Sequence, residues 1–400
     1  MTDRGAPGST DNDAFLRLCL RSRWQPSVLS EAQRLAASGR IDWQAVCELA
    51  RAGGLAPLLH DALRGCEWLP GAAAGCLQDA YHETAVFAGL MSVELNRVLQ
   101  VLADAGLPAI VLKGAALGHT LYGNPALRPM TDLDLLLRQP DVPAAVAALK
   151  GCGYRSTVAE VRPGHALEFE NELVLRSPGT PSLAVELHWR LLDSPFYQAQ
   201  IDEGWFWQTA QPARIAETDS LVLGTEANIL HLSAHYVLHH KAQGIRWICD
   251  LAGLVEQSAA GGAIDWRLVL SKATGFRLVA SVQLVLQQLT TDWQSPVSED
   301  VVRAALRLPV SEEEQRVVRW MLSERRPVVQ RFWADLAGMS GWRQRASFLL
   351  ANLFPSPAYM VERYDLPGPA LTPLAYPYRW AIGLGEFVSS RRKARASEAG

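Results

Sequence analysis

The stretch Thr131-Asp132-Leu133-Asp134-Leu135-Leu136-Leu137 places two aspartates inside an apolar run. Its length and apolar content predict a largely buried β-strand. Because side chains alternate across a strand, Asp132 and Asp134 would share one face about 7 Å apart, while Leu133 points into the core. Carboxylates at this spacing can share divalent cations that lie about 3.5–4 Å apart. Buried carboxylates need such an ion or an arginine partner, and Arg128 is close enough in sequence to be one.

A strand followed by the start of a helix precedes the acidic run. Residues 108–112 are apolar and rich in β-formers, and Lys113-Gly114-Ala115 leads into a helix predicted over residues 115–122. Backbone N–H groups at the beginning of a helix attract phosphate, and a glycine lets the phosphate approach closely. Lys113 can add a point charge for a triphosphate. The segment therefore predicts nucleotide contacts at Lys113, Gly114 and Ala115.

A third acid is expected on a neighbouring strand. Within the predicted strand 182–189, Glu186 has apolar neighbours and shares a face with His188, so we assign it as the third acid. Three other glutamates are candidates for this role. They occupy every second position of a strand predicted over residues 167–175, and that pattern is typical of a solvent-exposed face. These alternatives are Glu168, Glu170 and Glu172.

Hydrophobic patterning divides the 400-residue chain into five segments. We expect a disordered N-terminus (1–13), a helical N-terminal domain (14–106), an α/β domain (107–204), a helical C-terminal domain (205–388) and a basic disordered tail (389–400). The fold class would be α+β, with a mixed sheet flanked by helices. Two long helices are expected, one over residues 82–105 with a single buried apolar stripe and one over residues 228–257.

Several motifs together resemble a bacterial family of largely uncharacterised nucleotidyltransferases that is assigned to the polymerase-β superfamily. The resemblance covers roughly residues 85–365. Its motifs are Lys113-Gly114, Leu121-Tyr122, Arg128, the runs 132–136 and 185–189, His235, His239, Arg246-Trp247, Asp250 and the run 353–356. The resemblance implies a polymerase-β-like core, metal binding by Asp132, Asp134 and Glu186, and a triphosphate at Lys113 and Gly114. The usual Gly-Ser pair of the superfamily is Gly114-Ala115 here, so a serine hydroxyl contact to phosphate is missing.

We therefore expect a metal-dependent nucleotidyltransferase that moves a nucleoside monophosphate from an NTP to an acceptor and releases pyrophosphate. The ion would be Mg²⁺ or Mn²⁺. Arg128 would orient the acidic strand or touch phosphate. The acceptor could be a small molecule, a peptide, a protein or RNA. Two alternatives stay open: a non-catalytic scaffold that keeps the fold, which Ala115 favours, and a phosphotransferase that uses the same acids.

The histidines His231, His235 and His239 follow one another at four-residue spacing on one predicted helix face. Two such imidazoles can bind zinc, but no H-E-x-x-H pattern is present, and a packed helical face fits the pattern better. A further hypothesis is that His235, Arg246 and Asp250 lie at the edge of the cleft and contact nucleotide or acceptor.

The composition limits the class of protein and the compartment that we expect. The formal net charge of −3 argues against a protein that coats nucleic acid. The six cysteines form no C-x-x-C pair, which favours reduced thiols. The polar N-terminus has no secretory signal, and no apolar run approaches the length of a membrane span. We expect a cytoplasmic protein without a membrane partner.

Overall fold

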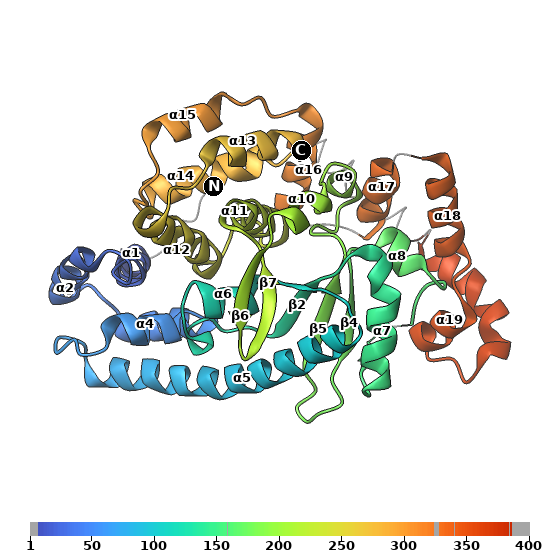
Figure 1. The fold of residues 1–400 in the computed structure, drawn as a ribbon, viewed down its shortest axis with the longest axis horizontal. Helices are drawn as coiled ribbons and strands as arrows, with labels where there is room; N and C mark the ends of the chain where they lie inside the picture. The colour runs from blue at the N-terminus through green and yellow to red at the C-terminus, as the bar shows by residue number, and fades with distance from the viewer. Residues whose placement is uncertain (1–6, 158, 324–327, 340, 384, 386–400) are drawn as a thin grey trace.

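A seven-stranded mixed sheet lies at the centre of the chain (Figure 1). The computed structural model describes residues 7–157, 159–323, 328–339, 341–383 and 385. The strand order is β3-β4-β5-β2-β1-β7-β6. The strands are β1 (Ile110–Val111), β2 (Asp132–Leu136), β3 (Arg155–Ser156), β4 (Glu172–Arg176), β5 (Ala184–His188), β6 (Gln211–Ile215) and β7 (Thr218–Val222). The predicted α+β class with a mixed sheet is confirmed.

The acidic strand β2 is in the middle of this sheet. It pairs antiparallel with β1 and parallel with β5. The register places Asp134 opposite Glu186 and Leu136 opposite His188. Consequently, two strands that are far apart in sequence present their polar residues side by side.

Alternate residues of β2 face two different cores. Leu133 and Leu135 are fully buried in one core, between the sheet and α5 (Gly71–Asp104). Leu136 belongs to the larger core, together with the helices drawn above the sheet in Figure 1. Because Asp134 is two residues from Leu136, its carboxylate lies on the side of the larger helical layer, as the alternation of a strand requires.

Helices cover both sides of the sheet. The N-terminal helices are α1 (Pro7–Arg21), α2 (Leu29–Ala37), α3 (Trp43–Ala52), α4 (Ala56–Leu63) and α5. Between the strands lie α6 (Lys113–Thr120), α7 (Val142–Gly151), α8 (His165–Phe169), α9 (Pro195–Gln198) and α10 (Glu203–Gln208). The C-terminal helices are α11 (Thr225–Ala234), α12 (Ile245–Gly261), α13 (Trp266–Gly275), α14 (Val279–Thr291), α15 (Glu299–Arg307), α16 (Glu312–Leu322), α17 (Val328–Gly338), α18 (Trp342–Leu353) and α19 (Pro357–Tyr364).

The 34-residue helix α5 runs beneath the sheet, and its apolar stripe is only half buried. Val98, Leu99 and Leu102 are buried as expected, but Val86 and Val93 are each 70% exposed. The prediction of one continuous buried stripe was therefore wrong at its N-terminal half, where the helix buries a different side. Within the described part of the chain, α5 is the one helix whose length and composition would suit a membrane span, and core helices of soluble proteins commonly pass the same test.

The hairpin β6–β7 was not expected, since the chain after Trp205 was predicted to be helical. β7 pairs in parallel with β1 and so extends the sheet on that side. β6 is the outer strand, where Pro212 is tolerated because an edge position leaves one side of the backbone unpaired. Residues 7–13, which were expected to be disordered, instead begin α1. The predicted tail 389–400 lies outside the described residues.

Two further elements differ from the sequence-based expectation. The long helix predicted over residues 228–257 is interrupted after α11 by a π-turn (His235–His239) and a loop. Gly244, with φ of 92°, precedes α12, and such a conformation is natural for glycine. The strand predicted over residues 167–175 begins only at Glu172, because Phe169 of α8 packs instead against Phe348 of α18.

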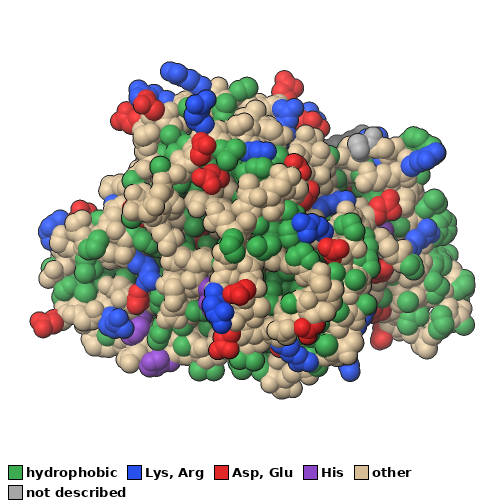
Figure 2. All heavy atoms as spheres, in the orientation of Figure 1, with side chains coloured by type: hydrophobic (Ala, Val, Ile, Leu, Met, Phe, Trp, Pro, Cys, Tyr) green, Lys and Arg blue, Asp and Glu red, His purple; other side chains and the backbone are tan. Residues whose placement is uncertain are grey.

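The C-terminal helices carry an apolar surface, visible as green side chains on the right of Figure 2. Its most exposed members are Trp342, Leu374 and Tyr378, at 60% or more. The same helices also contact the sheet domain, where Ser356 donates its backbone N–H to the carbonyl of Val161.

Leu133, between the two aspartates, tests the placement of β2. We expect Leu133→Ala to lower the free energy of unfolding by about 2–5 kcal/mol, because the side chain is fully buried. Val93→Ala removes an apolar side chain that is 70% exposed and should change it by less than about 0.5 kcal/mol. Urea denaturation followed by circular dichroism measures both. Equal effects of the two variants would contradict the assigned orientation of the strand.

Candidate active site

A cleft of about 840 Å³ opens where β2 and β5 face the C-terminal helices. Asp132, Asp134 and Glu186 line one wall. Lys113, Gly114 and Arg128 also line the cleft. Ala115 differs, because its side chain is buried in the core beneath the sheet, so that only its backbone could reach a phosphate. The helical wall contributes His235, His239, His240, Arg246 and Trp247.

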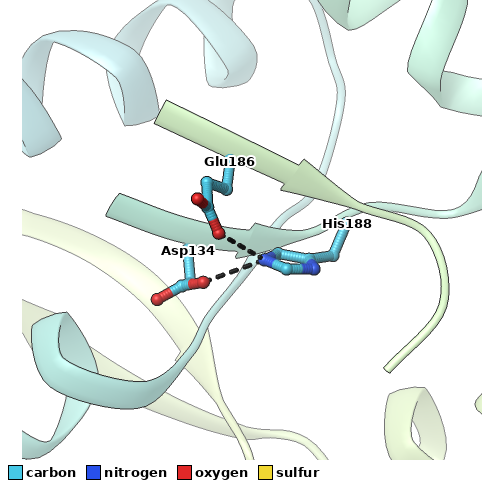
Figure 3. A group of neighbouring side chains, drawn as sticks. All are labelled: Asp134, Glu186 and His188. Carbon is cyan, nitrogen blue, oxygen red and sulfur yellow. Dashed lines mark hydrogen bonds and ion pairs between the residues drawn. The ribbon is translucent and has the colours of Figure 1, made fainter. Parts of the chain in front are cut away.

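Asp134 and Glu186 come together around the imidazole of His188 (Figure 3). The Nε2 atom of His188 lies 2.9 Å from Oδ1 of Asp134 and 3.5 Å from Oε2 of Glu186. The side-chain ligand atoms of the three residues all lie within 4.8 Å of one another. Glu186 therefore approaches Asp134 from the adjacent parallel strand, as the sequence analysis expected.

Glu172 is a partner of this group that the sequence analysis missed. It was assigned to a solvent face, but its carboxylate is half-buried and lies 3.1 Å from Nδ1 of His188. The sequence did indicate that His188 belongs to this group, because His188 lies two residues after Glu186 on the same strand face. What the sequence could not show is the antiparallel register of β4 and β5, which places Glu172 directly opposite His188.

Three carboxylates hold His188 in its charged form. Burial and the nearby Lys113 lower the pKa of His188, but its hydrogen bonds with Asp134, Glu172 and Glu186 outweigh both and raise this pKa to about 10. Both imidazole nitrogens then carry protons and donate to carboxylates. His188 thus acts as a buried cation at the junction of the acids.

The pKa values of the acids shift in different directions because their neighbours differ. Burial would raise the pKa of Asp134, but Lys113 and His188 hold it well below its usual range. For Asp132, burial and the charge of Asp134 raise the pKa. The hydrogen bond from His188 lowers the pKa of Glu186, yet burial and Asp134 outweigh it, and the net shift is upward. Burial and the charge of Asp134 thus disfavour the ionised forms of Asp132 and Glu186, and a bound cation would favour them.

Lys113 begins α6 with a φ of 48°, and its ammonium points back at the acids. Its Nζ lies 2.7 Å from Oδ1 of Asp134. Gly114 follows in the first turn, where a side-chain methyl group would come within 3.1 Å of Cβ of Met130. The close approach of these two segments favours a small residue at this position.

A hard divalent cation fits the oxygen donors of this wall. Lys113 and His188 both contact Oδ1 of Asp134, and within the described part of the chain no hydrogen bond uses its Oδ2. Asp132 and Glu186 add carboxylate oxygens that face the same cleft. Mg²⁺ and Mn²⁺ prefer such ligands.

Arg128 does not pair with Asp132 or Asp134, but it positions the segment that leads into the acidic strand, which is one of the two roles expected for it. It is 2% exposed and donates through Nε and Nη2 to Asp250 of α12, with a shortest distance of 2.7 Å. The hydroxyl of Tyr122 also donates to Asp250, and Nη1 of Arg128 donates to the carbonyl of Pro129. Arg128 therefore ties the segment before β2 to α12, and its donors are occupied. Asp250, which was expected at the edge of the cleft, is buried in this ion pair.

The histidines of the π-turn and the adjacent His240 form a group of packed rings. Nε2 of His240 lies 3.0 Å from Nε2 of His235, and the ring of His240 stacks on Trp247 with centroids 3.8 Å apart. Burial and neighbouring cationic groups lower the pKa of His240 to about 3. Among the described residues, the one cluster suited to a metal is Asp134, Glu186 and His188, so the zinc alternative finds no support here.

Acids thus converge from two parallel strands beside a strand-to-helix turn that carries lysine and glycine. Residues 39–291 match the model of a protein family described as "Uncharacterised nucleotidyltransferase", and the chain belongs to that family. No curated protein matches the chain. The family match ends before α15, so the C-terminal helices α15–α19 lie outside it.

The buried pair Arg128–Asp250 should be a principal link between the sheet and the C-terminal helices. We expect Asp250→Asn to lower the free energy of unfolding by about 3–5 kcal/mol, because it leaves the guanidinium buried without its counter-charge. The matched control is Asp219→Asn, which breaks a surface pair whose carboxylate is 91% exposed and should cost less than about 1 kcal/mol. Urea denaturation measures both. A similar small loss for the two variants would show that the buried pair does not link these parts.

Proposed function

We propose that this protein transfers a nucleoside monophosphate from a nucleoside triphosphate to an acceptor, with release of pyrophosphate, in a reaction that requires Mg²⁺ or Mn²⁺. The observation that carries the proposal is the position of Asp134 and Glu186, directly opposite each other on parallel strands at the wall of one cleft. The family of the chain supports a nucleotidyl-transfer role.

Each residue of the acidic wall has a part in this proposal. Asp132, Glu186 and the Oδ2 atom of Asp134 would hold the cation, which when bound neutralises phosphate oxygens and aligns the attacking group. His188 would keep Asp134 and Glu186 in place, because its Nε2 atom forms a hydrogen bond with Asp134 and an ion pair with Glu186. Glu172 in turn orients the imidazole from its other side.

Lys113 and the start of α6 would bind the phosphates. The ammonium of Lys113 contacts Asp134, and a triphosphate beside it would share that charge. The backbone N–H groups at the beginning of α6 carry no side-chain cap, since Leu112 at the cap position offers none.

The acceptor is the open part of the proposal. A cleft of about 840 Å³ is within the range that holds small ligands of about 300–1,000 Å³. The six cysteines are all free, which suits a reducing compartment such as the cytoplasm, where nucleoside triphosphates are plentiful.

Transfer of label from nucleotide to a cell extract tests the reaction type. Each NTP is supplied with the label either at the α-phosphate or at the γ-phosphate, and products are separated after incubation with the protein and Mg²⁺. We expect α-label in the product and γ-label in pyrophosphate. A product that carries only the γ-label would identify a phosphotransferase instead, and no labelled product from any NTP would favour the scaffold alternative.

Glu186→Gln is the decisive variant in this assay. It keeps the shape of the side chain but removes its charge, so we expect turnover to fall by about 10²–10³-fold or more. The control is Glu299→Gln on α15, where the carboxylate is 92% exposed, and its turnover should equal that of the wild type. Equal activity of Glu186→Gln and wild type would remove Glu186 from the catalytic group.

A further inference from the structure

Arg246, in the first turn of α12, is a cation without an anion. Its side chain is half-buried at the wall of the cleft. Within the described part of the chain it forms no ion pair, and its one hydrogen bond is a long contact of 3.4 Å from Nη1 to the carbonyl of Pro129. Its Nε atom is buried with no hydrogen-bond partner. The guanidinium therefore has N–H groups that could donate hydrogen bonds to a ligand.

The surroundings of Arg246 favour an incoming negative charge. Burial and the neighbouring Arg128 lower the pKa of Arg246 to about 10, which shows that its charge is not compensated locally. The Asp250 carboxylate that could neutralise it is fully engaged by Arg128. Burying part of a guanidinium that lacks a partner lowers the stability of the folded protein. Such a group is typical of a ligand-binding site.

The side chain of Arg246 is nevertheless held in one place. The guanidinium lies 4.5 Å from the ring centroid of Trp247, in a cation–π contact. On its other side, Gly54 of the turn between α3 and α4 leaves room for it, because a methyl group there would approach Nη1 to 2.7 Å. Residues from the N-terminal helices and from α12 thus hold a cation that neither of them neutralises.

The location of Arg246 indicates which negative group it would meet. Its Nη1 and the Nη1 of Arg128 both donate to the carbonyl of Pro129. The next residue, Met130, packs against Gly114 at the beginning of α6. Arg246 is therefore on the side of the cleft where Lys113 and Gly114 begin the helix. It is also near enough to Asp132 for the two charges to act on each other.

We propose that Arg246 binds the terminal phosphates of the nucleoside triphosphate from the side of the C-terminal helices. This inference rests on the proposed function, because it assumes a triphosphate substrate. The planar guanidinium can donate two parallel hydrogen bonds to a phosphate. The binding of pyrophosphate as leaving group would use the same contact.

The probe for this inference is inorganic tripolyphosphate, titrated calorimetrically into the full-length protein with Mg²⁺ in excess. We expect Arg246→Gln to weaken its binding by about 10–100-fold, as the loss of a charge-assisted hydrogen bond would do. Arg246→Lys keeps the charge without the fork of donors and should bind with intermediate affinity. The matched control, Arg214→Gln, removes a guanidinium that is 66% exposed on β6 and should bind like the wild type.

Thermal unfolding separates binding from a structural role. Because Arg246 has no ion pair and is repelled by Arg128, Arg246→Gln should keep or raise the melting temperature of the free protein. A clear fall in that temperature, or an unchanged affinity for tripolyphosphate, would overturn the inference and leave the proposed function intact. Weaker binding in Arg246→Gln, combined with no transfer of α-label by the wild type, would confirm the anion site and contradict the proposed function instead.

Discussion

The parallel pairing of β2 with β5 is the constraint on which the rest of the site depends. Its register places Asp134 opposite Glu186, and the antiparallel strand β4 then places Glu172 opposite His188. Four charged side chains thereby meet on one face of a sheet whose other face is packed with leucine and valine. Such a cluster is tolerated because His188 is a cation that contacts three of the carboxylates, and because Lys113 adds a second positive charge.

The second wall of the cleft depends on a different ion pair. Arg128 and Asp250 fix the start of α12 against the segment that leads into β2. The break after the π-turn brings His240 and Trp247 into contact, and the same break orients Arg246 toward the cleft. The two walls thus have complementary charge. Carboxylates lie on the strands and the guanidinium of Arg246 lies on α12, an arrangement that suits a substrate carrying both bound metal and free phosphate oxygens.

The sequence predicted those parts of the structure that depend on local patterns. The run around Asp132 has the apolar alternation of a buried strand, and Glu186 was found by the same reasoning on the next parallel strand. The features that the sequence did not predict depend on contacts between distant segments. The hairpin β6–β7 exists because β1 offers it an edge, α8 forms because Phe169 packs on Phe348, and Arg128 is occupied because α12 brings Asp250 to it. No pattern within a single segment carries such information.

The proposed function requires the carboxylates of β2 and β5 to bind a divalent cation together with a nucleoside triphosphate. The decisive experiment is calorimetric titration of each NTP into the wild-type protein, first with Mg²⁺ and then with an excess of chelator. We expect at least one NTP to bind with Mg²⁺ present and its affinity to fall by about tenfold or more without it, because the acids and the phosphates then repel each other. Equal affinity in the two conditions would contradict it.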